Sequence, residues 1–197
     1  MIADHQDYAK HVLNAIHHRR SLPSASMKPD PLKEEHLAAI LEAANQAPSH
    51  RHTEPWRFRI YQSEAARDDL GQGLAKVYQS FAGPSFFEAK FKKTRLRPTL
   101  VPVVIAVICS PGEKANLPLY EEILAVGCAV QNMHLAAHAL GVGMIWSTPG
   151  YYDHPELREL MEMAENSHFM GLLYLGYPAC PFPTSKRRPL SEKTVWL

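Results

Sequence analysis

The sequence predicts a single layered domain of the α/β or α+β class. Its 197 residues suffice for one substantial core, and a composition of 46% hydrophobic and 21% charged residues is ordinary for a globular protein. Four segments have strand character, and segments with helical spacing of apolar residues separate them. No linker, internal repeat or low-complexity tract divides the sequence, so we expect one domain over residues 1–197.

The first half of the chain is expected to hold three helices and one strand. Apolar residues recur at three- and four-residue spacing over residues 6–18, 33–46 and 64–80. Ser63 precedes the third helix and offers a hydroxyl that accepts an unpaired backbone N–H of the first turn. Residues 56–62 alternate between apolar and polar side chains, which is typical of a strand.

The second half is expected to hold three strands and two helices. Residues 101–109 are a continuous β-branched run, typical of a strand that is buried on both faces. Residues 118–140 predict a long helix of about 30 Å that ends at Gly141, and its many small residues would let another helix approach closely. The remaining expected elements are shorter, and they are strands at 142–147 and 168–176 and a helix at 154–163 that begins after Asp153.

Three segments are expected to lie outside this regular framework. Residues 19–31 carry three prolines and predict a loop. Residues 82–98 are basic and aromatic, and we interpret them as a mobile excursion that is part helix. The chain from Pro178 onward is rich in proline again and predicts an extended C-terminal arm at about 179–197.

Charge and cysteine content narrow the class of protein. The net charge of +1 gives no global bias toward nucleic acid or a membrane surface. The three cysteines are odd in number and widely separated, so we expect no disulfide framework and interpret the protein as cytoplasmic. No segment is long and uncharged enough to predict a membrane span, and the polar N-terminus predicts no secretory signal.

Three polar segments suggest an anionic ligand. Residues 46–56 form a donor-rich loop, and a helix and a strand would hold its two ends. An Arg-Arg-Ser sequence occupies residues 19–21, and Lys-Arg-Arg occupies residues 186–188. Arginine forks suit the oxygens of a phosphate. Taken alone, however, each basic segment is better explained as a solvated helix end or a solvated tail.

Other kinds of site have little support in the sequence. The pairs His17/His18 and His50/His52 lack cysteine or carboxylate neighbours at zinc spacing, so we expect no metal site. No nucleophile-elbow motif is present, and the glycine pair at 141–143 ends a helix where a dinucleotide fingerprint would open one.

Four segments, in order along the chain, resemble the nitroreductase-like flavoprotein family. They are residues 19–21, the Ala-Pro-Ser loop from 47 to the Pro-Trp at 55–56, the segment 141–146 after the long helix, and residues 173–179 followed by 187–190. The resemblance covers about residues 16–190 and is closer to the small, compact branch of the family. It implies an α+β, three-layer fold with a central mixed, mainly antiparallel sheet flanked by helices, in a swapped-arm homodimer.

The resemblance also implies that FMN binds at the subunit interface. The residues that it assigns to FMN are Arg19, Arg20 and Ser21 for the phosphate and ribityl chain, Arg187 or Arg188 for the phosphate, His50 from the loop, and Trp146, Ser147 and Thr148 for backbone contacts with the isoalloxazine edge.

The implied activity is that of an FMN-dependent NAD(P)H oxidoreductase. NAD(P)H would deliver a hydride and leave, and a small electron-poor acceptor, nitroaromatic or quinone-like, would then enter the same slot. No obligate catalytic residue is expected, and water or His50 would supply the proton. Two alternatives stay open, namely a flavin carrier or sensor with little turnover and a dimer of this fold with an empty or repurposed site.

Three positions depart from the family pattern. Pro23 stands where a further arginine is frequent, and His52 and Glu54 stand where asparagine and glutamine are common. A Glu54 carboxylate against the ring would lower the flavin potential, because its charge disfavours the anionic reduced ring. Alternatively, Glu54 would pair with Arg51 or Arg57.

Overall fold

A four-stranded antiparallel sheet forms the centre of the protein. The computed structural model describes residues 5–112 and 117–197. The strands are β1 (Trp56–Tyr61), β2 (Val103–Cys109), β3 (Gly143–Ser147) and β4 (His168–Gly176). Their order across the sheet is β1-β2-β4-β3, with every pairing antiparallel, so β1 and β3 are the edge strands.

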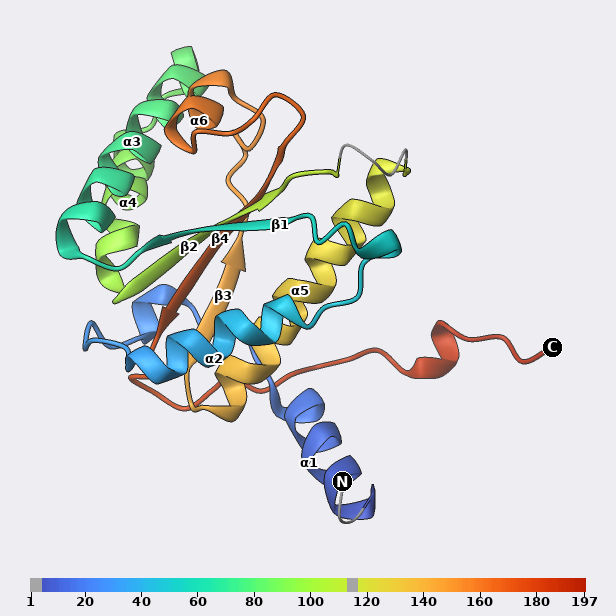
Figure 1. Ribbon diagram of the computed structural model, residues 1–197. Coiled ribbons are helices and arrows are strands. Elements are labelled where there is room, and N and C mark those ends of the chain that lie inside the picture. Colours follow the sequence, from blue (N-terminus) through green and yellow to red (C-terminus); the bar gives the residue numbers. More distant parts are fainter. Residues whose placement is uncertain (1–4, 113–116) are drawn as a thin grey trace.

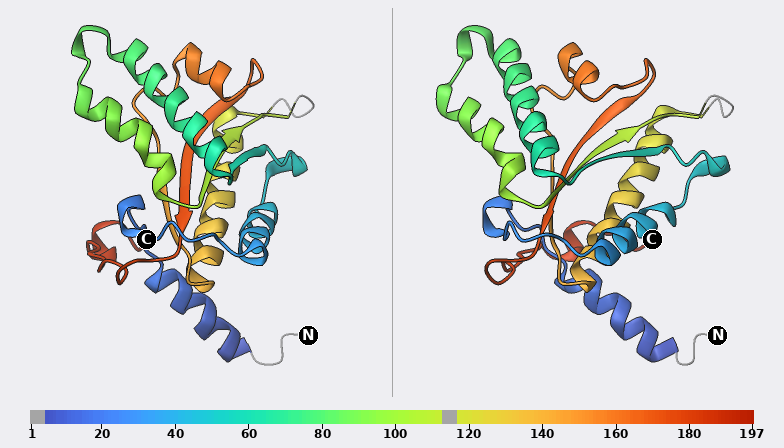
Figure 2. Two further views of the ribbon diagram at one scale, coloured as in Figure 1. Left: turned by 90° about the vertical axis from the view of Figure 1, so that its left-hand side faces the viewer. Right: turned by 60° about the vertical axis from the view of Figure 1, so that its left-hand side comes forward.

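Helices cover both faces of this sheet and make three layers (Figure 1). Helices α2 (Glu34–Asn45) and α5 (Leu119–Ala139) pack on one face. Helices α3 (Glu64–Ala82), α4 (Glu88–Leu96) and α6 (Pro155–Leu160) lie on the other, as the turned views in Figure 2 also show. In the described part of the chain, short 3-10 turns lie at Ser24–Ser26, His50–His52, Gly83–Ser85, Arg97–Leu100 and Leu190–Glu192.

The sequence of β2 explains why the sheet has a core on each side. Every residue of β2 is buried. Because side chains alternate along a strand, Val103, Ile105 and Val107 enter the core beneath α2 and α5, whereas Val104 and Ala106 enter the core beneath α3. The expectation of a strand buried on both faces is therefore confirmed, although both of its neighbours run antiparallel to it.

The expected helices and strands are present, with differences at their ends. The Ser63 hydroxyl accepts the Ala66 N–H at 3.1 Å, as predicted for the cap of α3. The basic excursion contains α4 between two 3-10 turns, which agrees with its interpretation as part helix. Helix α6 ends at Leu160, three residues earlier than expected, and the chain then turns through a positive φ of 43° at Glu162.

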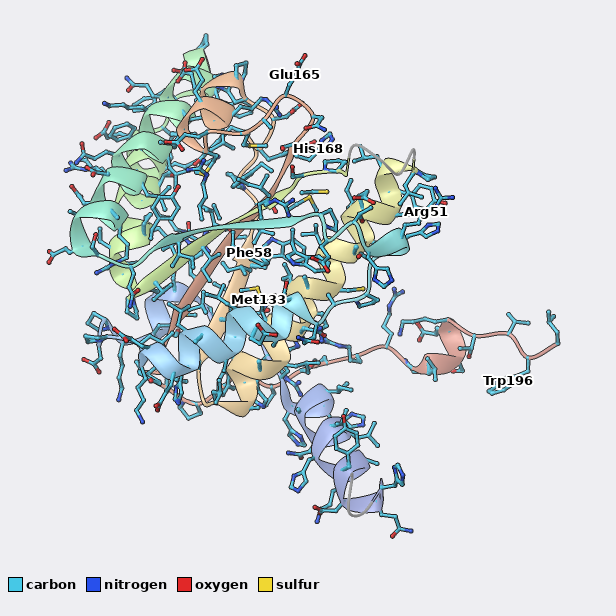
Figure 3. The ribbon with its side chains drawn as sticks, in the orientation of Figure 1. Arg51, Phe58, Met133, Glu165, His168 and Trp196 are labelled. Carbon is cyan, nitrogen blue, oxygen red and sulfur yellow. The ribbon has the colours of Figure 1, made fainter. Side chains whose placement is uncertain are left out.

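Two segments project from the compact part of the chain (Figure 1). Helix α1 (His5–His18) buries none of its residues, although Tyr8, Leu13 and Ile16 form an apolar stripe that is about half exposed. The tail beyond Phe182 is largely exposed and ends with Trp196 at 94% exposure; Figure 3 shows this side chain far from the sheet. The chain's own domain therefore covers neither the apolar stripe of α1 nor the tail.

Helix α5 is covered on one side only. One side packs in the core through residues such as Val126, Val130 and Met133. The opposite side leaves Tyr120 and Leu124 about 60% exposed, with the exposed Cys128 one turn further on. The uncovered apolar surface is thus a stripe along α5.

Candidate functional site

Arginines from both ends of the chain meet at the end of α1. Arg19 and Arg20 follow directly after this helix, and Arg187 arrives from the tail. Burial is the main cause that lowers the pKa of Arg19, and the charges of Arg187 and Arg20 lower it further, so both of these arginines lie near Arg19. Among the described residues, no carboxylate makes an ion pair with any of them. Within residues 5–112 and 117–197, the positive charge of this arginine cluster (Arg19, Arg20, Arg187) therefore has no carboxylate partner.

Arg20 has a local role within this cluster. Its Nη1 donates to the carbonyl oxygens of His17 and Arg19, both at 2.7 Å. These carbonyls lie at the C-terminal pole of α1, where a cation is favourable. Part of the simpler explanation for Arg20, a helix-end cation, therefore holds.

The tail offers two arginines, and one of them, Arg187, influences the pKa of Arg19. Arg188 lies 3.9 Å from the carboxylate of Glu192, in an exposed pair. The charge of Arg187 instead lowers the pKa of Arg19. Of the two candidates in the tail, the geometry favours Arg187.

Two histidines of α5 lie beside the arginine cluster. Burial and, secondarily, Arg19 lower the pKa of His134 to about 4. Burial, His18, Arg19 and Arg20 lower the pKa of His138, whose buried Nδ1 has no hydrogen-bond partner. The surroundings of both imidazoles thus disfavour the charged form. A phosphate here would meet cations, and none of the described carboxylates is paired with them.

Ser21 connects the arginine cluster to the free edge of the sheet. Ser21 forms a parallel bridge with Met144 of β3, and the Leu22 N–H donates to the Met144 carbonyl at 3.1 Å. Backbone groups alternate in direction along a strand, so the backbone of Trp146 points to the same edge as that of Met144. An edge strand keeps such groups available for a ligand.

A bulge in β4 fixes the side chains at the end of β3. Met170 is an extra residue in the pairing with β2, where the register shifts. Its carbonyl accepts the Trp146 Nε1–H at 2.7 Å and the Thr148 hydroxyl at 3.4 Å. At Gly171, which has a φ of +119°, a Cβ would lie 2.7 Å from the Trp146 Nε1, so glycine lets the indole reach this carbonyl.

Arg97 contacts the same region and was not identified from the sequence. Its Nη1 donates to the Ser147 hydroxyl at 2.8 Å, and its guanidinium lies 4.2 Å from the centre of the Tyr174 ring. Arg97 is one of several basic residues in the excursion at 82–98. The only sequence signal was this concentration of cations.

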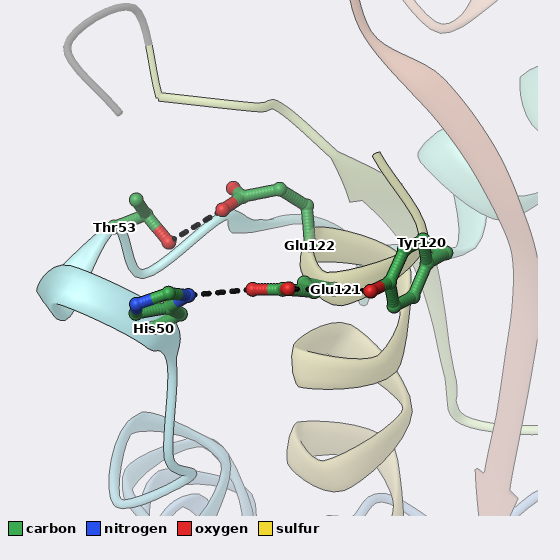
Figure 4. A network of polar contacts seen from close by, with 5 residues as sticks. All are labelled: His50, Thr53, Tyr120, Glu121 and Glu122. Carbon is green, nitrogen blue, oxygen red and sulfur yellow. Dashed lines mark hydrogen bonds and ion pairs between the residues drawn. The ribbon is translucent and has the colours of Figure 1, made fainter. Parts of the chain in front are cut away.

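The loop that contains His50 is strained and is held by α5 (Figure 4). His50 Nδ1 lies 2.6 Å from a Glu121 carboxylate oxygen, and the Thr53 hydroxyl donates to the buried Glu122 carboxylate at 2.9 Å. Arg51 and His52 both have a φ of 54°, and Glu54 has a φ of 45°. Positive φ in non-glycine residues is unfavourable and concentrates at functional loops. Arg57 donates to the Glu54 carbonyl at 2.8 Å, so this hydrogen bond does not use the Glu54 carboxylate.

One chain does not bring all the predicted residues together. His50 contacts Glu121 near the start of α5, whereas the charges of Arg19 and Arg20 lower the pKa of His138 near its end. The 17 residue steps from 121 to 138 correspond to about 25 Å of helix. His50 and the arginines therefore occupy opposite ends of α5.

Other kinds of site find less support. Within the part of the chain that the structure describes, no group of three or more His, Cys, Asp and Glu side chains is placed to hold a metal ion. None of the described helices is long and apolar enough to cross a membrane. Cys109, Cys128 and Cys180 are free thiols.

Comparisons with known proteins all point to the same family. The nitroreductase family model matches residues 16–177. The Escherichia coli (strain K12) protein YdjA, provisionally named an NAD(P)H nitroreductase, is 31% identical over 177 residues, which are 90% of this chain and 93% of YdjA. YfhC of Bacillus subtilis (strain 168), with the same provisional name, is 27% identical over 178 residues, covering 90% of each protein.

Solved structures support the fold. A nitroreductase-like family protein from Bacillus cereus has a TM-score of 0.78 and 25% identity, over 94% of this chain and 95% of that one. A provisionally assigned nitroreductase from Desulfovibrio desulfuricans, solved in complex with FMN, has a TM-score of 0.74 and 27% identity, over 94% and 96%. The predicted nitroreductase-like α+β fold is confirmed. The family match ends before Arg187.

Proposed function

This chain belongs to the nitroreductase family, and we propose that it is an FMN-dependent NAD(P)H oxidoreductase that reduces an electron-poor acceptor by a ping-pong mechanism. The arginine cluster carries this proposal, because three guanidinium groups with no ion-paired carboxylate among the described residues suit the dianionic phosphate of FMN. The FMN complex of the Desulfovibrio desulfuricans relative adds independent support.

The residues beside the cluster suit the rest of the cofactor. Ser21 leads from the arginines to β3, so the ribityl chain would follow this edge of the sheet. The isoalloxazine would then lie at the backbone of Trp146, Ser147 and Thr148. Bound FMN supplies hydride and electron transfer. The backbone N–H groups at this edge would stabilise negative charge on the reduced ring.

A second copy of the chain would complete this site. The apolar stripe of α1, the exposed stripe of α5 and the projecting tail all lack a cover in one chain. Homodimers related by a twofold axis bury the same surface on both copies. Two α5 helices packed in opposite directions would bring His50 of one copy toward the arginine cluster of the other. This arrangement would overcome the separation of about 25 Å within one chain.

The protein needs no obligate acid or base for this reaction. His50 is the candidate proton donor, because Glu121 holds its ring at the tip of a constrained loop. A second hydrogen bond, from Thr53 to Glu122, ties the loop to the same helix. Water at an open site would serve equally, so we expect replacement of His50 to slow turnover only partly.

Steady-state kinetics of the FMN-loaded protein tests the proposal. NADH and NADPH should each be varied against a nitroaromatic and a quinone acceptor. A ping-pong enzyme gives parallel lines in double-reciprocal plots, since one substrate leaves before the next binds. FMN that stays bound but does not turn over with either nicotinamide or either acceptor would contradict an oxidoreductase and favour a flavin carrier or sensor.

A further inference from the structure

A cavity beside the end of β3 is lined by cations. Its volume is about 380 Å³, within the range of small-molecule sites. It lies between α3 and α4 on one side and the segment after β3 on the other. The lining residues are Leu74, Lys90, Lys93, Thr94, Arg97, Ser147, Thr148, Pro149, Gly150, Tyr151, Leu172 and Tyr174.

Helix α4 and the 3-10 turn after it place Lys90, Lys93 and Arg97 along this cavity in a regular pattern. Positions 90, 93, 94 and 97 are spaced by three and four residues, which places them on one side of a helix. Lys92, between them, instead lies 3.4 Å from the carboxylate of Glu88. The lining contains three cations and no carboxylate.

The positions of two of these cations are defined by aromatic rings. Lys90 Nζ lies 4.9 Å from the centre of the Tyr78 ring, and Arg97 lies over Tyr174. Burial raises the pKa values of Tyr151 and Tyr174, so both phenols stay uncharged at neutral pH and do not offset the cations. Lys93 is exposed and makes no ion pair with a described residue.

This cavity is separate from the arginine cluster but adjoins the expected ring position. The cluster connects to β3 at Met144 through Ser21 and Leu22, whereas the cavity begins at Ser147, at the other end of this strand. Ser147 and Thr148 belong to both the cavity wall and the segment assigned to the isoalloxazine edge. A molecule in the cavity would therefore lie next to a flavin ring in the proposed place.

We propose that this cavity binds the carboxylate of the electron acceptor, so that the preferred acceptors are aromatic acids. The proposal rests on the proposed oxidoreductase function and narrows its substrate class. Lys90 and Lys93 hold the carboxylate, and the uncharged lining, including Leu74 and Leu172, receives the ring. A phosphate of the nicotinamide substrate is the other source of negative charge that could meet these lysines.

Binding can be measured without turnover. Benzoate and its neutral analogue benzamide are titrated by calorimetry into the FMN-loaded protein, in the wild type and in Lys90→Gln/Lys93→Gln. The wild type should bind benzoate at least about tenfold more tightly than benzamide, and the double variant should lose this preference. Lys92→Gln is the matched control and should behave as the wild type. Equal binding of the two ligands by the wild type would overturn the proposal.

Kinetics separates the two sources of negative charge. The double variant should raise KM for 4-nitrobenzoate about tenfold and leave KM for nitrobenzene, NADH and NADPH unchanged. An increase confined to the nicotinamide substrates would show that the lysines hold a phosphate and would refute the acceptor site. Weakened FMN affinity in the double variant would also refute it, because the lysines would then belong to the cofactor. A protein that binds benzoate selectively but has no turnover would contradict only the oxidoreductase function.

Discussion

Replacing Arg19 with alanine should weaken FMN binding far more than it weakens folding. Arg19 is partly buried and interacts with two other arginines, and the described residues provide no carboxylate partner. In the apoprotein its charge is therefore opposed by burial and by repulsion. Its removal should leave the free energy of unfolding nearly unchanged, or slightly raised.

In the FMN-bound protein, the phosphate would instead stabilise the charge of Arg19. Loss of one charge-assisted contact with a phosphate costs roughly 1.5–3 kcal/mol, which corresponds to a roughly 10- to 150-fold rise in the Kd for FMN. Riboflavin lacks the phosphate, so its affinity should not change in the variant.

Fluorescence titration of flavin gives the Kd, and urea unfolding of the apoprotein gives the stability. Arg95→Ala, which removes an exposed arginine from α4, is the matched control. Unchanged FMN affinity in Arg19→Ala, or an equal loss of riboflavin binding, would refute a phosphate role and return Arg19 to a helix-end cation.

Three further changes test other parts of the structure. Deletion of residues 179–197 should weaken both dimerisation and FMN binding; sedimentation and flavin titration would show a dimer with full FMN affinity if the tail has neither role. His134 has a pKa of about 4 against an ordinary 6.5, so the unfolded chain gains its proton first as pH falls. This linkage should reduce the apoprotein's stability by about 3 kcal/mol between pH 6.5 and 4, with nothing lost above that range. His134→Leu should flatten the decline in unfolding experiments across this range, whereas an unaltered slope would exclude His134 as its source. Gly71→Ala should destabilise the protein by about 1–3 kcal/mol, because its Cβ would lie 2.1 Å from the Arg95 carbonyl oxygen. Gly127→Ala meets nothing within 4 Å, and equal stability of the two variants would contradict the close approach of α3 and α4.

Much of the fold was predictable from local patterns. The β-branched run of β2 and the hydroxyl cap at Ser63 are local signals, and both led to correct elements. The end of α6 was less predictable, because the turn at Glu162 uses a positive φ that few glutamate residues adopt. Strand pairing is non-local, and the buried β2 run alone did not show that its neighbours would be antiparallel.

The candidate site was predictable only where a motif marked it. The motif at residues 19–21 led to Arg19 and Arg20, and the charge of Arg187 reaches Arg19, but their role with FMN stays a prediction. Arg97 and the lysines of α4 were not identified, because their common cavity depends on how α4 packs beside β3. The contact of His50 with Glu121 was missed for the same reason, since 71 residues separate them in the chain.

Anaerobic reduction of the bound cofactor tests the central claim most directly. The purified protein is loaded with FMN and mixed with NADH or NADPH in the absence of oxygen and acceptor, while absorbance near 450 nm is followed. In an FMN-dependent oxidoreductase, one equivalent of nicotinamide should bleach the bound FMN, and the rate of bleaching should saturate as the nicotinamide concentration rises. The colour should return on addition of a nitroaromatic or quinone acceptor. Persistent yellow colour with both nicotinamides would contradict the proposed function.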